Sequence, residues 1–286
     1  MWLLYAFGSA IFAGVTSILA KIGIKNTDSN LATALRTVIV LLFSWLMVFA
    51  VGSQRTISTI SAHSLVFLIL SGSATGVSWL CYFKALQLGN VNKVTPVDKS
   101  STILTILLAF LFLGEIPTIW MGAGIILLAA GTCLMIQRQE SESSDVKNKS
   151  WLFYAVLSAV FAALTCILGK IGIQEIESNL GTAIRTSVVL VLAWGIVLFQ
   201  KKAVFLKNID RKSRIFIALS GLATGISWLC YYRALQEGKA SLVVPIDKLS
   251  IVVTVTFSCI FLKEKLSGKA IAGLLLVISG TMLLLF

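Results

Sequence analysis

The stretch S-G-S-A-T-G-V-S-W-L-C-Y at residues 71–82 returns as S-G-L-A-T-G-I-S-W-L-C-Y at residues 220–231, which is 149 positions later. Across the longer windows 71–101 and 220–250, 19 of 31 positions are identical. Chance similarity between apolar helices would not give so many matches at polar and apolar positions alike. The sequence therefore predicts two copies of one structural unit.

The boundary between the copies follows from the same offset. The opening residues W-L-L-Y-A at 2–6 return as W-L-F-Y-A at 151–155. Residues 137–150 read Q-R-Q-E-S-E-S-S-D-V-K-N-K-S, a polar stretch without glycine or proline that is typical of a solvated linker. We expect a first repeat over 1–136, a linker over 137–150 and a second repeat over 151–286.

The composition indicates a membrane protein. Apolar residues make up 57% of the chain and charged residues 13%, and the mean hydropathy is +0.94, which excludes an ordinary soluble domain. Apolar runs of about 20 residues, long enough as helices to cross a bilayer, recur along the chain. They lie near 2–20, 30–51, 64–86, 94–113, 118–136, 151–169, 179–199, 213–236, 243–262 and 267–286. The runs are unbroken, so we predict an all-α integral membrane protein, multi-pass in the cell membrane, rather than a barrel.

The number of spans per copy predicts how the copies are related. Five spans is an odd number, so the second copy enters the bilayer from the opposite side, and the ten transmembrane helices form two inverted five-helix repeats. The loops on one side carry fifteen Lys and Arg, and those on the other side carry three. By the positive-inside rule, this contrast predicts that both termini face away from the cytoplasm. We interpret the net charge of +12 as topology signals and lipid contacts, not as a nucleic-acid surface.

A proline, a carboxylate and an ammonium recur together, as P-V-D-K at 96–99 and as P-I-D-K at 245–248. Proline is expected in the first turn of each helix. Adjacent residues point about 100° apart on a helix, so Asp and Lys within one pair do not neutralise each other. Either the carboxylates stabilise the first turn at the headgroups, or Asp98, Lys99, Asp247 and Lys248 form a charged cluster near the pseudo-two-fold axis. We expect the cluster, with a role in binding or gating a solute.

Polar and aromatic side chains form stripes on the expected helices 64–86 and 213–236. Helical spacing puts Ser71, Thr75, Ser78 and Tyr82 on one face, and the second copy repeats the pattern. The aromatic residues belong either to an interfacial belt or to a cavity wall, and we favour the cavity. The residues that we expect at a solute-binding site are Asp98, Lys99, Asp247, Lys248, Trp79, Tyr82, Trp228, Tyr231, Tyr232, Ser78, Ser227, Arg36 and Arg185.

Basic residues outnumber acidic ones among the cavity candidates. Two acidic residues, Asp98 and Asp247, face six basic ones: Arg36, Lys84, Lys99, Arg185, Arg233 and Lys248. Lys84 and Arg233 lie nearer the helix ends, where long cationic side chains extend to the headgroups. The balance favours an anionic or zwitterionic solute over a plain cation.

These motifs resemble the ten-helix drug/metabolite transporter superfamily, of the EamA type. The resemblance covers the whole chain and includes A-L-Q-x-G at 85–89 and 234–238, together with L-G-E-I-P-T at 113–118, which looks like the glycine-glutamate turn of the family. It implies a basket of ten helices around a cavity, with 118–136 and 267–286 peripheral. Known relatives move amino acids, nucleotide sugars, triose phosphates, choline and other small polar metabolites. The family usually places both termini in the cytoplasm, opposite to the loop charges here, and Lys263 replaces the turn glycine in the second copy.

We therefore predict a secondary-type transporter of a small polar metabolite, working by alternating access around a central cavity. No catalytic constellation, metal-ligand spacing or nucleotide-binding loop is readable, so we expect no enzyme activity and no cofactor. Its partners are a small-molecule solute and membrane lipids, with a coupling ion or counter-solute and a monomeric or homodimeric state left open. The alternatives are a flippase for a lipid-linked polar head group and a non-transporting membrane scaffold.

Overall fold

The computed structural model describes residues 1–23, 27–88, 94, 97–98, 100–135, 150–261 and 268–285. The first repeat contains α1 (Trp2–Gly23), α2 (Ser29–Val51), α3 (Ala62–Leu88), α5 (Ser101–Phe112) and α6 (Ile119–Met135). The second contains α7 (Ser150–Gly172), α8 (Ser178–Phe199), α9 (Arg211–Glu237), α10 (Ala240–Lys248), α11 (Ser250–Phe261) and α12 (Gly268–Leu283). Two short 3-10 helices, η1 (Ser53–Thr59) and η2 (Lys202–Asn208), follow α2 and α8. The expected linker lies outside the described residues, except Ser150, which begins α7.

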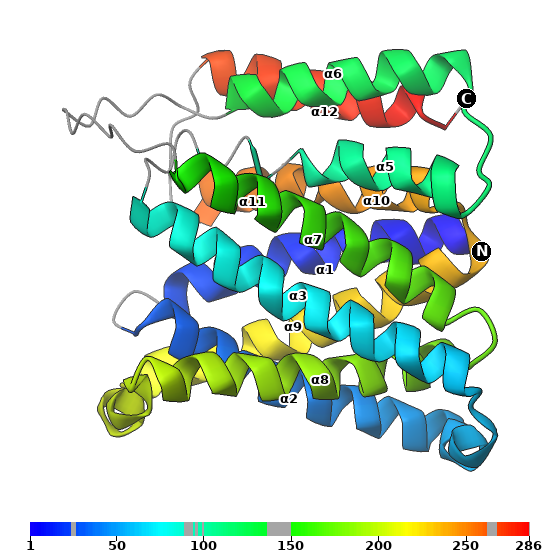
Figure 1. Cartoon of the computed structure of the whole chain (residues 1–286). Helices are drawn as coiled ribbons and strands as arrows, with labels where there is room; N and C mark the ends of the chain where they lie inside the picture. The colour runs from blue at the N-terminus through cyan, green and yellow to red at the C-terminus, as the bar shows by residue number, and fades with distance from the viewer. Residues whose placement is uncertain are drawn as a thin grey trace.

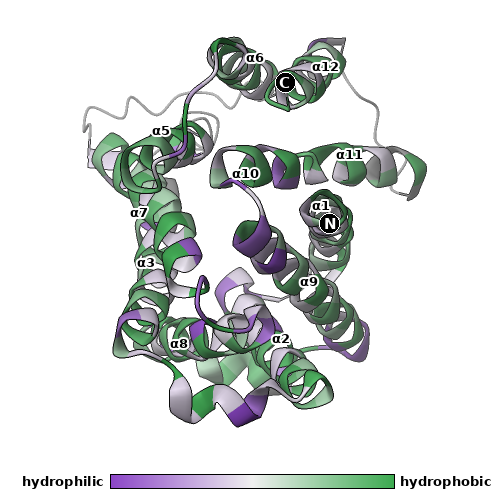
Figure 2. Ribbon diagram, turned by 90° about the vertical axis from the view of Figure 1, so that its right-hand side faces the viewer, coloured by the Kyte–Doolittle hydropathy of each residue, from purple (hydrophilic) through white to green (hydrophobic). Residues whose placement is uncertain are grey.

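The helices have the length and composition of membrane spans. Among the described residues, seven helical segments are long and apolar enough to cross a bilayer, and one of them combines α10 with most of α11. Three shorter apolar helices correspond to α5, α6 and α12. The described part of the chain contains no strand, and apolar residues line the helices along most of their length (Figure 2). The protein is an all-α integral membrane protein, as the sequence predicts.

The arrangement of the helices is that of inverted repeats. Both termini lie at the same end of the bundle, which we call the terminal end, and α2 runs antiparallel to α8, as α6 does to α12 (Figure 1). Helix α1 packs along α9, and its counterpart α7 packs along α3. The same packing thus occurs twice, with the roles of the two repeats exchanged. Because corresponding helices run in opposite directions, the repeats are related by a two-fold axis that crosses the helices and therefore lies in the membrane plane.

Glycines allow the two repeats to approach closely. A Cβ on Gly131 of α6 would lie 2.7 Å from the carbonyl oxygen of Gly273 on α12. A Cβ on Gly280 would lie 2.9 Å from the carbonyl oxygen of Gly124. Small residues are how membrane helices bring their backbones into contact without a hydrophobic driving force. The pair α6 and α12 thus forms a tight unit beside the main bundle (Figure 2).

The helix starts of the two repeats are built alike. Asp28 caps α2 by accepting hydrogen bonds from the amides of Asn30 and Leu31, and it pairs with Lys202 Nζ at 2.6 Å. Glu177, which is 149 residues later, caps α8 by accepting from the amide of Leu180. Carboxylates at these positions satisfy free amides and favour the helix dipole.

The expected helix over 243–262 differs from the structure. It begins at Ala240, so Pro245 lies inside α10 and not in the first turn, and the helix is interrupted after Lys248. Pro245 has no N–H to donate to the Ser241 oxygen, and at the interruption the Leu249 amide donates to the Ile246 oxygen in a tightened turn. The predicted helix start was wrong because the first turn of α10 is capped by a residue far away in the sequence. Glu115 accepts hydrogen bonds from the amides of Ala240 and Ser241, at 2.6 and 3.0 Å.

Candidate functional site

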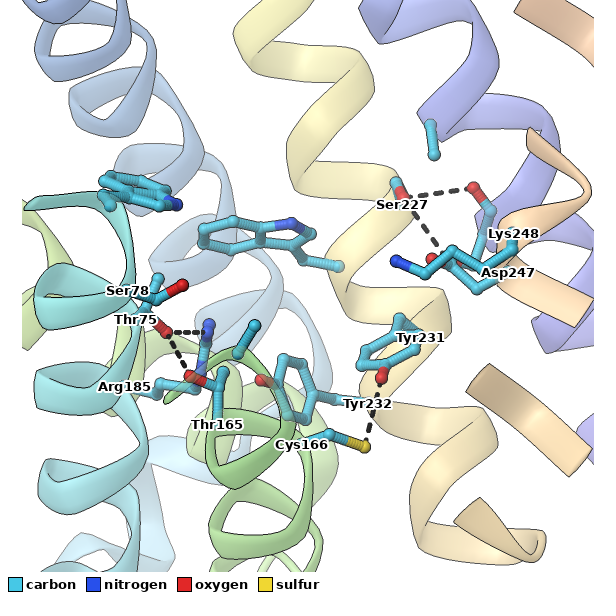
Figure 3. A pocket seen from close by; sticks show the side chains of 15 residues that line it. Thr75, Ser78, Thr165, Cys166, Arg185, Ser227, Tyr231, Tyr232, Asp247 and Lys248 are labelled. Carbon is cyan, nitrogen blue, oxygen red and sulfur yellow. Dashed lines mark hydrogen bonds between the residues drawn. The ribbon is translucent and has the colours of Figure 1, made fainter. Parts of the chain in front are cut away.

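A cavity of about 320 Å³ lies between the two repeats (Figure 3). Six helices contribute to its wall, two from the first repeat and four from the second. The lining residues are Ser9, Ala13, Thr75, Ser78, Trp79, Ala162, Thr165, Cys166, Arg185, Ser227, Trp228, Tyr231, Tyr232, Asp247 and Lys248. This volume is at the lower end of the range of small-molecule sites in proteins.

Arg185 of α8 is the most constrained charge in the wall. Only 3% of its surface is exposed. Its Nε donates to Ser71 Oγ at 3.1 Å, and its Nη2 donates to Thr75 Oγ1 at 2.7 Å (Figure 3 shows the second bond). Its Nη1 is buried and has no hydrogen-bond partner among the described residues. A buried guanidinium nitrogen without an acceptor is costly, so this arrangement fits an acceptor supplied by a ligand.

Aromatic rings hold the Arg185 guanidinium from the other side. Its Cζ lies 5.0 Å from the centroid of the Trp228 ring and 4.8 Å from that of the Tyr232 ring. The Tyr231 hydroxyl donates to Cys166 Sγ at 3.2 Å, and the rings of Tyr231 and Tyr232 meet edge to face. Cation–π contacts stabilise the charge while leaving the guanidinium edge available for planar recognition.

Asp247 and Lys248 lie at the interruption between α10 and α11. Asp247 Oδ1 accepts a hydrogen bond from the Ser9 hydroxyl at 2.6 Å. Lys248 is half-buried in the wall and has neither a hydrogen-bond nor an ion-pair partner among the described side chains. Interrupted helices commonly provide ion and solute sites in transporters, because the free backbone groups line a cavity.

Two serine–aspartate clusters, related by the repeat, flank the site. Ser9 and Ser227 hydroxyls lie 3.3 Å apart beside Asp247. In the counterpart, the Ser158 hydroxyl lies 3.3 Å from that of Ser78 and donates to Asp98 Oδ1 at 2.8 Å. Sequence reasoning missed Ser9 and Ser158, which stand among apolar residues. These two serines are 149 residues apart, and this repeat offset is the signal that could have found them.

The structure brings nine of the thirteen expected site residues to the cavity wall. These are Trp79, Trp228, Tyr231, Tyr232, Ser78, Ser227, Arg185, Asp247 and Lys248. Arg36, Tyr82 and Asp98 do not line it, and Lys99 lies outside the described residues. Of the other basic candidates, Lys84 is exposed and Arg233 pairs with Glu237 at 2.7 Å. The wall therefore has two basic residues and one acidic residue.

The two ends of the cavity differ. On α7, Cys166 is one turn beyond Ala162 on the lining face and is 5% exposed. On α1, Ser17 is one turn beyond Ala13 on the lining face, 149 residues before Cys166, and is exposed. Helices α1 and α7 run in opposite directions, so these residues lie towards opposite ends of the bundle (Figure 1). The cavity is covered at the terminal end, where α7 finishes.

A buried ion pair lies at this covered end. Lys170, in the last turn of α7, has its Nζ 3.7 Å from Glu115 Oε1 and also donates to the carbonyl oxygen of Gly238. Lys170 is 8% exposed and Glu115 is 9% exposed. A lysine in the last turn of a membrane helix commonly reaches the interface, but Lys170 is buried, and Glu115 supplies the opposite charge. The pair joins the α5–α6 connection to α7 and to the start of α10.

Among the described residues, no group of three His, Cys, Asp or Glu side chains could hold a metal ion. The polar groups of the wall include hydroxyls, indole N–H groups, a thiol, a carboxylate, an ammonium and a guanidinium. Such a set is suited to hydrogen bonding and charge pairing with a small polar molecule.

Known proteins share both the sequence and the fold. The model of the EamA-like transporter family matches residues 1–137 and 149–286. A protein of Sinorhizobium sp, named as an uncharacterized transporter in the cobO 3' region, is 44% identical over 137 residues, which are 48% of this chain and 97% of that protein. The uncharacterized transporter YxxF of Bacillus subtilis is 23% identical over 244 residues, 85% of this chain and 76% of that protein.

A solved crystal structure has the same fold, with a TM-score of 0.81 and 17% identity over 98% of this chain and 94% of that chain. The Sinorhizobium relative aligns over the length of a single repeat, as expected if each repeat is one structural unit. The family match extends over both halves. The chain belongs to the EamA-like transporter family and is a multi-pass membrane transporter.

Proposed function

We propose that the protein is a secondary-type transporter that binds a small anionic or zwitterionic metabolite in the cavity and moves it by alternating access. The observation that carries this proposal is Arg185, a wall residue whose buried Nη1 has no acceptor in the part of the chain that the structure describes. A carboxylate or phosphate oxygen on the solute would satisfy this nitrogen through a charge-assisted hydrogen bond.

The remaining charges support the same class of solute. Lys248 offers a second cation that pairs with no described residue, so the described wall has an excess of positive charge. Within the described part of the chain Asp247 accepts a hydrogen bond only at Oδ1, so its other oxygen can pair with an ammonium group of the solute. A zwitterion would use all three charges, whereas a dication would face two positive groups.

The energy source of transport belongs to the proposal as well. No nucleotide-binding loop of the G-x-x-x-x-G-K-S/T kind occurs in the sequence. We therefore assign the driving force to a gradient, either of the solute itself or of a coupling ion or counter-solute. The polar wall, built from both repeats, favours a carrier over a passive scaffold.

A thermal-shift experiment with matched four-carbon compounds tests the charge preference. The purified protein is heated with succinate, γ-aminobutyrate, 1,4-diaminobutane or 1,4-butanediol. A ligand present at a hundred times its dissociation constant stabilises the folded state by about 2.7 kcal/mol. We expect stabilisation by the dianion or the zwitterion, and loss of it in Arg185→Gln. Arg233→Gln, which removes an exposed arginine outside the wall, is the matched control.

Two results would contradict the proposal. One is stabilisation by the diamine alone, and the other is an undiminished response to the dianion or zwitterion in Arg185→Gln. If none of the four compounds stabilises the protein and an intact phospholipid does, with the effect lost in Arg185→Gln, the result would also contradict the soluble-solute proposal and support the flippase alternative.

A further inference from the structure

The backbones at Arg36 and Arg185 occupy equivalent places in the two repeats. A Cβ on Gly72 of α3 would lie 3.0 Å from the carbonyl oxygen of Arg185. A Cβ on Gly221 of α9 would lie 3.1 Å from the carbonyl oxygen of Arg36. The backbone of each arginine therefore packs at the same place on the long helix of the opposite repeat.

The two side chains nevertheless differ. Arg185 bonds Ser71 and Thr75 and stacks on two rings in the cavity wall. Arg36 does not line the cavity, and no hydrogen bond, ion pair or ring contact joins its guanidinium to a described residue. A guanidinium about two turns inside a membrane helix is costly without a partner. In this state the Arg36 guanidinium thus has no partner among the described residues.

A docking place for Arg36 already exists on α9. Ser220 and Thr224 are the counterparts of Ser71 and Thr75, and Trp79 is the counterpart of Trp228. Ser220 Oγ now donates to the Ile217 oxygen, and Thr224 Oγ1 donates to the Ser220 oxygen at 2.7 Å. Thr75 makes the same internal bond, at 3.0 Å to the Ser71 oxygen, while accepting from Arg185. A threonine hydroxyl has two lone pairs, so Thr224 can accept from Arg36 in the same way.

The asymmetry of the arginines matches the asymmetry of the cavity ends. Arg185 is docked in a state in which Cys166 is buried and Ser17 is exposed. A state open at the terminal end would exchange the environments of the two repeats, and with them those of Arg36 and Arg185. Each state would then have one docked arginine.

We infer that Arg36 is a second anion-binding residue, which docks on Ser220, Thr224 and Trp79 and replaces Arg185 in the state that opens at the terminal end. Rotation of the repeats brings Arg36 to the cavity as Arg185 leaves it. The solute therefore meets a buried guanidinium in both states. The inference rests on the proposed function for the nature of the solute, but the exchange of arginines is measurable without any solute.

Cysteine labelling reports the two states. N-ethylmaleimide is reacted with Ser17→Cys protein, and mass spectrometry gives the labelling rates of Cys166 and of the new thiol in one sample. Cys166 reacts from the state open at the terminal end, and the thiol at position 17 reacts from the described state. The ratio of the two rates follows the population ratio of the two states.

The two arginine substitutions should move this ratio in opposite directions. Arg185→Gln removes charge-assisted bonds of the described state, so we expect the Cys166 to position-17 ratio to rise about tenfold. Arg36→Gln removes those of the other state, so the ratio should fall by a similar factor. Arg233→Gln should leave it unchanged.

A second matched pair guards against folding defects in the arginine variants. Thr75→Val removes one of the two hydroxyl acceptors of Arg185 and should raise the ratio, whereas Thr224→Val should lower it. If Arg36→Gln and Thr224→Val both leave the ratio unchanged, or shift it in the same direction as their counterparts, the exchange is disproved. The charge preference of the cavity would still stand in that case, because the thermal-shift series tests it separately.

Discussion

The Ser9 hydroxyl donates a hydrogen bond to Asp247 Oδ1 at 2.6 Å, which joins the first helix of one repeat to the interrupted helix of the other. The counterpart bond, from Ser158 to Asp98, is 2.8 Å long, but Asp98 is not in the cavity wall. One motif is therefore present twice, but only one of its two aspartates lines the cavity. This difference separates structural from functional roles.

Ser9→Ala and Ser158→Ala should destabilise the protein about equally, by about 1 kcal/mol each, because each removes one bond to a carboxylate. Only Ser9→Ala should also weaken the stabilisation by γ-aminobutyrate, because the Asp247 carboxylate that faces the cavity then loses the hydrogen bond that positions it. Thermal unfolding in detergent, with and without the compound, measures both effects. Equal losses of ligand response in the two variants would assign the clusters a purely structural role.

Much of this arrangement could be predicted from the sequence. The constant offset gives the two repeats, and the helical period places Trp79, Trp228 and Arg185 on faces that point away from lipid. The interruption at α10 could not be predicted, because the cap at its start comes from Glu115, more than one hundred residues earlier. Nor could the different environments of Arg36 and Arg185, since repeats with matching sequences do not encode which state is populated.

The ion pair of Glu115 and Lys170 should contribute more to stability than an exposed pair. Glu115→Gln leaves the buried Lys170 ammonium uncompensated and weakens the cap of α10, so we expect a loss of about 3 kcal/mol. Glu237→Gln removes an exposed partner of Arg233 and should cost about 0.5 kcal/mol or less. The free energy of unfolding in mixed micelles distinguishes them. Similar losses in both variants would mean that the buried pair adds nothing beyond a surface pair.

The contact between α6 and α12 predicts a sharp contrast between two glycines of α6. Gly131→Ala places a methyl group 2.7 Å from a backbone oxygen of α12, so the helices must separate, at a cost of about 1–3 kcal/mol. Gly122→Ala meets nothing within 4 Å and should be neutral or stabilising. Melting temperatures of the two variants test this packing. A neutral Gly131→Ala variant would show that α6 and α12 are less closely packed than described.

Asp28 predicts a specific pH dependence at the start of α2. Partial burial raises the pKa of this carboxyl, but hydrogen bonds from Lys202 and from the Leu31 and Asn30 amides outweigh that effect and hold the pKa below its usual value. The resulting stabilisation is complete above the unfolded pKa of about 3.9 and is lost as the pH falls through the folded pKa.

The stability difference between the parent and Asp28→Asn should therefore be constant from about pH 7 to 5 and shrink below about pH 4. Denaturation series at several pH values measure it, with Glu177→Gln at the equivalent cap as the control. A stability difference between the parent and Asp28→Asn that grows towards low pH would contradict a lowered pKa of Asp28.

Transport by Arg185 variants tests the central claim most directly. Proteoliposomes containing the parent, Arg185→Gln or Arg233→Gln are preloaded with γ-aminobutyrate, and exchange against the radiolabelled compound is followed, with succinate in parallel vesicles. We predict saturable exchange of at least one compound by the parent and by Arg233→Gln, and a loss of about tenfold or more in Arg185→Gln, because its charge-assisted contact is gone. Exchange at the parental rate by a folded Arg185→Gln protein would contradict the account.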